Sequence, residues 1–211
     1  MKHVYVYLLD TLADWELGYV LSGLNSGQFF KADHPKLSMK TVSLSKDPIK
    51  TLGGITILPD GLIDKIIIEK DTILLLPGAY TWDDPKHLPI IEKAKQLLAV
   101  GGTVAAICGA TGALANAGLL DNRPHTSNAV EYLEMVCPTY KGQSHFKSER
   151  AYMDQNLITA SAAGALLWAR YIIERADVFA EHTLELWYKY YETGDSKYMF
   201  EFLNEFPENE K

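Results

Sequence analysis

The clearest chemical signal in the sequence is Cys108, which stands between an apolar run and a series of small residues. Residues 104–107 are typical of a buried strand, and residues 109–113 are the glycines, alanines and threonine of a closely packed helix start. A residue that joins a strand directly to a helix lies at the carboxyl edge of the sheet, beside the free N–H groups of the helix. Because those donors favour a thiolate, we expect the Cys108 thiol to ionise more easily than a free thiol and to act as a nucleophile, as in a nucleophile elbow. The alternative is a buried thiol that acts as a small hydrophobe, the commoner role of a lone cysteine.

Two further features are expected at the same edge of the sheet. Glu16 falls in the opening turn of a helix that follows the first strand, and a carboxyl group near the thiol would hold a proton and donate a hydrogen bond to it. Gly78 ends the middle strand, so its N–H and that of Gly109 are candidates for an oxyanion hole. Each feature also has a simple structural interpretation, Glu16 as a first-turn residue that complements the helix dipole and Gly78 as part of a turn.

Composition narrows the class of protein. The 211 residues contain 20 basic and 27 acidic side chains and carry a net charge of −7, which argues against nucleic acid or an anionic membrane as a partner. No apolar run is long enough to span a bilayer, and the N-terminus indicates a strand instead of a signal peptide. The two cysteines fit a reducing cytoplasm, and neither lies in a metal-binding pair. We therefore expect a cytoplasmic protein with neither a metal nor a cofactor, and the site at Cys108 leads us to expect a small-molecule substrate.

The order of elements predicts the architecture. Apolar strands alternate with amphipathic helices, which indicates one mostly parallel sheet covered on both faces. In such sheets ligands bind beyond the carboxyl ends of the strands, where Cys108 is expected. The predicted strands are residues 4–9, 39–44, 72–76 and 103–107; the predicted helices are residues 14–25, 88–100, 109–117 and 162–174; and two hairpins turn near residues 53–54 and 154–156.

The C-terminal part of the sequence differs from the rest. Residues 178–206 are rich in aromatic side chains interleaved with acids, and the pattern predicts two helices that break near Gly194 and Asp195. An aromatic stripe of this kind is more often core or dimer packing than a ligand site. We expect residues 1–176 to form the α/β domain and residues 177–211 to form a helical extension that packs on it or at a dimer interface.

The segment from Ala105 through Cys108 to Arg123 resembles the elbow block of the DJ-1/PfpI family, a branch of the class I glutamine amidotransferase-like superfamily. The segments 14–16, 74–78 and 156–160 match in order and spacing, so the resemblance covers residues 3 to about 175. It implies a flavodoxin-like three-layer sandwich, a homodimer and a strained backbone at the elbow. By the matching motifs, Cys108 is the nucleophilic or oxidation-sensitive thiol, Glu16 is its carboxyl partner, and Gly78 and Gly109 are the oxyanion donors.

The sequence departs from this family at the position of the histidine. Many members carry histidine directly after the cysteine, where this chain has Gly109, and others carry it at the end of a later short strand, where Asn128 stands. His125 is the nearest local candidate for a catalytic base, but it lies three residues earlier, and an odd shift along a strand changes the face of the side chain. His145 is a second candidate that is more typical of a loop or an edge.

Other polar residues invite simpler interpretations. Glu181 and His182 lie at roughly the distance from Cys108 that suits a glutamine amidotransferase, but they fall within an aromatic helix, so we interpret them as surface or packing residues. Cys137 is expected to be structural. Residues 82–85 either form the rim of the pocket or cap a helix through Asp84.

These expectations lead to two functional hypotheses. The first is a cysteine-dependent hydrolase-like enzyme, either amidase- or protease-like or glyoxalase- or deglycase-like, in which Cys108 attacks a small carbonyl or amide substrate. The alternative is a redox or stress-response protein in which oxidation of the same thiol is sensed without turnover. A pure binding module is a third class, and we discount its DNA-binding form because no additional DNA-binding domain is expected in this chain. One elbow supports several chemistries, so the fold alone does not choose between them.

Overall fold

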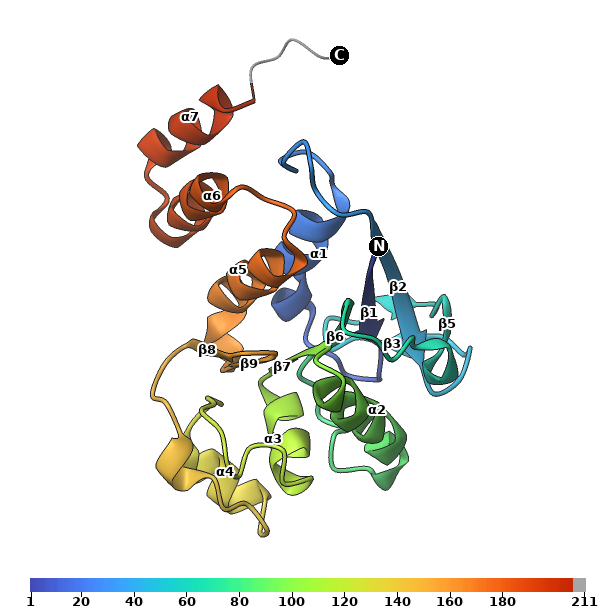
Figure 1. Cartoon of the computed structure of the whole chain (residues 1–211). Helices are drawn as coiled ribbons and strands as arrows, with labels where there is room; N and C mark the ends of the chain where they lie inside the picture. The colour runs from blue at the N-terminus through green and yellow to red at the C-terminus, as the bar shows by residue number, and fades with distance from the viewer. Residues whose placement is uncertain (207–211) are drawn as a thin grey trace.

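The computed structural model describes residues 1–206 and contains a seven-stranded sheet in the order β5-β2-β1-β6-β7-β9-β8 (Figure 1). All neighbouring strands are parallel except β8 and β9, which form an antiparallel pair at one edge. The mostly parallel sheet predicted from the sequence is therefore confirmed. The strands are β1 (Lys2–Tyr7), β2 (Leu37–Ser43), β5 (Gly61–Leu62), β6 (Thr72–Leu76), β7 (Thr103–Ile107), β8 (Ala151–Asp154) and β9 (Leu157–Ala160).

Helices cover both faces of this sheet, which confirms the three-layer arrangement. In Figure 1, α1 (Asp14–Asn25) and α5 (Ala165–Ala176) lie on one face, and α2 (Leu88–Ala99), α3 (Gly109–Asn116) and α4 (Val130–Val136) lie on the other. The predicted hairpin around Gly53 and Gly54 is also present, as β3 (Ile49–Lys50) paired with β4 (Thr56–Ile57). Short 3-10 helices span Ile63–Lys65, Pro85–His87, Gln143–His145 and Ala162–Gly164. None of the helices within residues 1–206 is long and apolar enough to cross a lipid bilayer.

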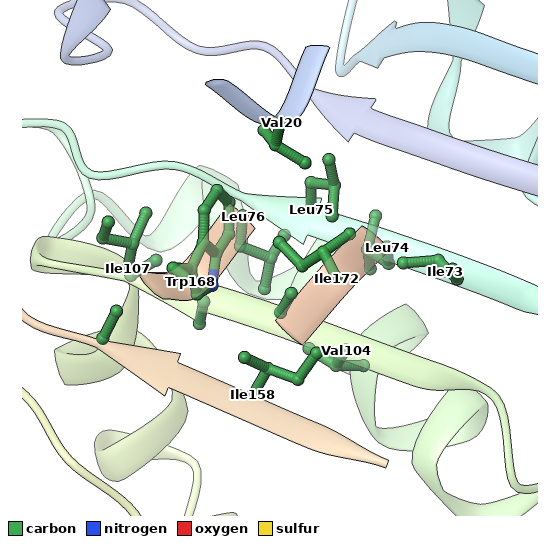
Figure 2. Close-up of a cluster of buried hydrophobic side chains, with 14 of the residues drawn as sticks. Val20, Ile73, Leu74, Leu75, Leu76, Val104, Ile107, Ile158, Trp168 and Ile172 are labelled. Carbon is green, nitrogen blue, oxygen red and sulfur yellow. The ribbon is translucent and has the colours of Figure 1, made fainter. Parts of the chain in front are cut away.

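The core lies on both faces of the central strands, against α1 and α5 on one side and against α2 and α3 on the other. Figure 2 shows Val20 of α1 together with Trp168 and Ile172 of α5, packed on the apolar strands β6, β7 and β9. All residues of β6 and β7 are buried, as expected for parallel strands covered on both faces. This burial fixes the carboxyl ends of β6 and β7, which carry Pro77 and Cys108, in a rigid frame.

The C-terminal helices form an aromatic layer on the outside of α1 and α5. Helix α6 (Glu181–Thr193) ends at Gly194, whose φ of 69° is left-handed, and α7 (Ser196–Asn204) begins after Asp195, which accepts a hydrogen bond from the Lys197 N–H. The break predicted from the sequence is confirmed. Aromatic pairs join these helices to the body, including Tyr19 with Trp187 and Phe29 with Phe202, whose ring centroids lie 6.2 and 4.2 Å apart. Residues 207–211 of the predicted extension lie outside the described residues.

Candidate active site

Cys108 occupies a strained elbow between β7 and α3. Its backbone has φ 56° and ψ −123°, a conformation that non-glycine residues rarely adopt. Its N–H donates to the Ala160 carbonyl oxygen at 2.9 Å, which extends the pairing of β7 with β9 into the turn. Such strain costs about 1–3 kcal/mol and persists only where the surrounding structure enforces it. The strained backbone that the resemblance implied is confirmed, and it presents a half-buried thiol at the carboxyl edge of the sheet.

Glu16 reaches the same edge from the first turn of α1. Its side chain is fully buried, and its Oε2 accepts a hydrogen bond from the Gly78 N–H at 2.6 Å. Its Oε1 is also buried, and among residues 1–206 no nitrogen or oxygen donor binds it; the group beside it is the Cys108 thiol. Burial raises the pKa of Glu16 to about 7, against the opposing effects of the Gly78 N–H and the Cys108 thiol. The carboxyl group is therefore able to exchange a proton near neutral pH.

Gly78 allows the carboxyl and the thiol to approach each other. A Cβ placed on this residue would lie 2.7 Å from the Cβ of Cys108 and 2.8 Å from Oε1 of Glu16. Both distances are too short for any side chain, so the glycine is required by the close approach of β6 to the two functional groups.

We expect Gly78→Ala to separate the two groups and to destabilise the protein. The added methyl group meets two atoms held by the core, so the free energy of unfolding should fall by about 1–3 kcal/mol, and any activity that depends on Cys108 should fall with it. Urea unfolding measures the first effect. Gly18→Ala is the matched control, because this α1 glycine has nothing within 4 Å of its Cβ position. That variant should gain about 0.5–1 kcal/mol from its higher helix propensity. Equal stability of Gly78→Ala and the wild type would contradict the packing described here.

Asn128 is the second side chain in contact with the thiol. Its Oδ1 accepts a hydrogen bond from the Ala162 N–H at 2.8 Å, which turns its Nδ2 toward Sγ of Cys108 at 3.5 Å. The backbone thus fixes the orientation of the amide. Asn128 can donate a hydrogen bond to sulfur, but it cannot accept the proton of the thiol. It stands at the position where the resemblance led us to look for a histidine.

The ionisation of the thiol differs from the sequence prediction. Burial raises the pKa of Cys108 above its ordinary value, and the charge of Glu16 acts in the same direction. The Asn128 amide and the Gly109 N–H act in the opposite direction without cancelling the cost of burial. The prediction of an easily ionised thiol was wrong because it counted the helix donors and left out desolvation. In the resting site the proton remains on sulfur and the carboxyl beside it is the group that can take it.

The backbone donors also differ from those predicted. The Gly78 N–H is already engaged by Glu16, so it cannot hold an oxyanion while that bond exists. The Ala79 N–H, one residue further, makes no hydrogen bond among the described residues. The Gly109 N–H faces the Cys108 side chain, and a Cβ on Gly109 would lie 3.6 Å from the Ala79 nitrogen. Of the two predicted backbone donors, Gly109 therefore keeps its N–H beside the thiol, whereas the Gly78 N–H is engaged by Glu16.

His125 serves a structural purpose away from the thiol. It is fully buried, its Nδ1 lies 2.8 Å from the Arg123 carbonyl oxygen, and its Nε2 lies 2.6 Å from the Tyr140 hydroxyl. Burial lowers its pKa, so the ring is neutral near pH 7. The selection of His125 as a base is corrected on this geometry, because both ring nitrogens are occupied. His145 lies on the 3-10 helix Gln143–His145 and makes no hydrogen bond to Cys108 in the described chain.

The remaining polar candidates have the structural positions that were favoured for them. Glu181 and His182 are exposed on α6, and Cys137 is buried with its thiol directed at the Gly112 carbonyl oxygen at 3.2 Å. Both interpretations of residues 82–85 hold. Asp84 caps the 3-10 helix by accepting from the Lys86 N–H, while Trp82 lines the pocket beside the elbow.

Two pockets flank the elbow. One, of about 270 Å³, lies beside Ala79 and Gly109, and the other, of about 390 Å³, lies beside Asn128. Both are small, which suits a compact ligand better than a folded chain. Within residues 1–206 no group of three or more histidine, cysteine, aspartate or glutamate side chains is placed to hold a metal ion.

Comparison with known families agrees with this geometry. The family model described as DJ-1/PfpI family matches residues 2–175 of the chain. This chain belongs to the DJ-1/PfpI family. The elbow thiol, its buried carboxyl partner and the sheet that carries them all lie within the matched residues.

Relatives within the DJ-1/PfpI family include two Bacillus subtilis (strain 168) proteins, each named as an uncharacterized protease. YoaZ is 44% identical over 203 residues, which cover 96% of this chain and 97% of that protein. YdeA is 34% identical over 188 residues, which cover 88% of each. The crystal structure of a thiJ/pfpI family protein from Bacillus anthracis has a TM-score of 0.93 and 44% identity over 96% of each chain. A DJ-1 superfamily protein from Agrobacterium tumefaciens shares the fold at 22% identity, with a TM-score of 0.78 over 92% of this chain and 99% of that one.

Two groups beside the thiol of this DJ-1/PfpI chain were not among the predicted site residues. Asn128 was identified only as the residue at the usual histidine position, and the signal that could have selected it is that alignment itself. The Ala79 N–H follows Gly78 directly, and no sequence signal distinguishes which of two consecutive amides a neighbouring carboxyl will occupy.

Proposed function

We propose that this protein is a cysteine-dependent hydrolase that acts on a small carbonyl or amide compound. The observation that carries the proposal is the fully buried Glu16 carboxyl, which lies within hydrogen-bonding reach of the Cys108 thiol at the close approach to Gly78. A carboxyl with a pKa of about 7 is well matched to removing a thiol proton at neutral pH. The names of the two Bacillus subtilis relatives, as proteases, support hydrolysis as the reaction class.

The first chemical step forms a carbon–sulfur bond. Sγ of Cys108 attacks the carbonyl carbon while the thiol proton passes to Glu16, and the carbonyl π electrons move to oxygen. The resulting oxyanion receives hydrogen bonds from the Gly109 and Ala79 N–H groups. The Asn128 amide stabilises the negative charge that develops on sulfur as the proton leaves.

The second step releases the first product and regenerates the thiol. The tetrahedral intermediate collapses, its oxygen electrons re-form the carbonyl, and the leaving alcohol or amine takes the proton from Glu16. Water then attacks the thioester, gives its proton to Glu16 and displaces sulfur, which recovers that proton. An aldehyde substrate would stop at the thiohemiacetal after the first step, because it carries no leaving group.

A chromogenic ester and an amide provide the direct test. Hydrolysis of p-nitrophenyl acetate and of an aminoacyl p-nitroanilide is measured for the wild type and for Cys108→Ala. Turnover that disappears in the variant supports the proposal, and turnover that persists in full contradicts it.

A second candidate function is sensing of oxidants at Cys108. The observation that favours it is the set of hydrogen-bond donors around sulfur, the Asn128 amide and the Gly109 N–H, which could hold the oxygen atoms of a sulfinate. We expect mild hydrogen peroxide to add oxygen to Cys108 before Cys137, which is buried. Intact-mass and peptide-mass measurements over a peroxide series test this. Equal oxidation of both thiols, or oxidation of neither, would contradict a sensing role.

A further inference from the structure

The pocket beside Ala79 and Gly109 contains a polar group for which the mechanism above has no use. This group is the hydroxyl of Tyr132, which comes from α4, a helix on the same side of the sheet as α3 (Figure 1). Tyr132 is half-buried, and within residues 1–206 its phenol takes part in no hydrogen bond. A polar group left free at the wall of a pocket is available to a ligand.

The position of this hydroxyl relates it to the elbow. A Cβ on Gly112 would lie 3.7 Å from the Tyr132 hydroxyl oxygen, so the phenol lies over the backbone of α3 about one turn beyond Gly109. Burial raises the pKa of Tyr132 above its ordinary value. The phenol therefore stays protonated at neutral pH and can donate a hydrogen bond.

The rest of the pocket determines what could reach this hydroxyl. Its walls are the aromatic rings of Tyr80 and Trp82 and the small residues Gly112 and Ala113, and its volume is about 270 Å³. A carbonyl oxygen held by the Gly109 and Ala79 N–H groups would direct its substituent into this space. A short chain would then run between the rings toward the phenol.

We propose that the Tyr132 hydroxyl hydrogen bonds to an oxygen atom on the acyl chain of the substrate and so selects small acyl compounds that carry a hydroxyl or similar group beyond the carbonyl. This inference rests on the proposed function in one respect, since it takes the same pocket as the acyl site. It makes Tyr132 a substrate-binding residue that sets specificity and takes no part in the proton transfers of the reaction.

Two thiol-alkylating probes of equal size test the inference without turnover. The chloromethyl ketones 1-chloro-4-hydroxybutan-2-one and 1-chloropentan-2-one carry a hydroxyethyl and a propyl acyl chain, and they differ only in a terminal hydroxyl against a methyl group. Sulfur displaces chloride from each probe, a carbon–sulfur bond forms, and Glu16 takes the thiol proton. The ratio of the second-order rate constants for the two probes cancels the intrinsic reactivity of the thiol. Peptide mass identifies alkylation at Cys108.

We expect the wild type to react with the hydroxyethyl probe about threefold to tenfold faster than with the propyl probe, the factor that one neutral hydrogen bond supplies. Tyr132→Phe should react equally with both. Tyr190→Phe, a matched loss of a hydroxyl from a half-buried tyrosine on α6, should keep the wild-type ratio. Thermal denaturation of Tyr132→Phe should match that of the wild type, because the lost hydroxyl has no partner in the described chain.

The outcomes separate this inference from the proposed function. A wild type without preference, a Tyr132→Phe variant that keeps it, or a Tyr190→Phe variant that loses it would each overturn the role of Tyr132. If the preference is present and disappears in Tyr132→Phe while the ester and amide substrates are not hydrolysed, the binding role stands and hydrolysis fails. If turnover depends on Cys108 but the two probes react alike, hydrolysis stands and the role of Tyr132 fails.

Discussion

Cys108→Ala is expected to lower turnover by about 10³-fold or more, because in the proposed mechanism the variant lacks the atom that forms the covalent intermediate. The thiol lies between the Glu16 carboxyl and the Asn128 amide. The alanine retains the strained backbone and leaves the Gly109 and Ala79 N–H groups in place, so binding of substrate should change little. Measured as kcat/KM on the ester and amide substrates, the loss should therefore appear mainly in kcat.

Cys137→Ala is the matched control for this experiment. It removes the other thiol of the chain from a buried site and should cost about 1 kcal/mol of stability while retaining turnover. If both variants lose activity equally, the loss reflects damage to the fold. If Cys108→Ala alone retains wild-type turnover, the elbow thiol is not the nucleophile.

Glu16→Gln should lower turnover and, at alkaline pH, raise the stability of the protein. The amide cannot take the thiol proton, so turnover should fall by about 10²–10⁴-fold, the usual contribution of general base catalysis. The Gln side chain keeps the shape of the carboxyl and still offers an oxygen to the Gly78 N–H. Substrate binding, measured as protection of Cys108 from iodoacetamide, should therefore survive the substitution.

The same variant should be more stable than the wild type at alkaline pH. The pKa of Glu16 is raised to about 7 in the folded protein from an ordinary value of 4.5, so the folded state holds a proton that the unfolded state releases. Protonation of Glu16 therefore stabilises the folded state fully below pH 4.5. This contribution to the free energy of unfolding, about 3 kcal/mol, is lost as the pH rises through about 7. Glutamine does not ionise, so urea unfolding at pH 8.5 should show Glu16→Gln more stable by up to that amount.

A comparison at low pH and an exposed glutamate complete this test. Below pH 4.5 the wild-type carboxyl is protonated in both states, so the pH-dependent advantage of Glu16→Gln should vanish there. Glu201→Gln, on the exposed face of α7, is the matched control for the substitution itself. If Glu16→Gln raises the free energy of unfolding by the same amount at every pH, burial does not raise the pKa of Glu16.

The strands and helices were largely predictable because their signals are local. The apolar runs of β6 and β7, followed by Pro77 and Cys108, specify parallel strands that are buried on both faces and end at one edge. The break at Gly194 was visible for the same reason, since a left-handed residue followed by the capping Asp195 is a local sequence signal. Helix α4 was not predicted, because its seven residues are too few to show a helical period.

The details of the site depended on distances that no local pattern encodes. The engagement of the Gly78 N–H by Glu16 follows from how closely α1 packs against the end of β6. The orientation of Asn128 is set by the Ala162 N–H, which lies 34 residues away in sequence. The direction in which the pKa of Cys108 shifts depends on how much of the thiol is buried, and that burial is determined by the whole fold.

The fixed amide of Asn128 has a consequence for the shape of the rate curve. Its oxygen is held by the backbone and its nitrogen faces sulfur, so the side chain contributes no ionisation of its own. A cysteine paired with an imidazole displays a bell, with one limb for each partner. In the proposed mechanism only the Glu16 carboxyl titrates near neutral pH, so a plot of rate against pH should rise once, around pH 7, and then reach a plateau.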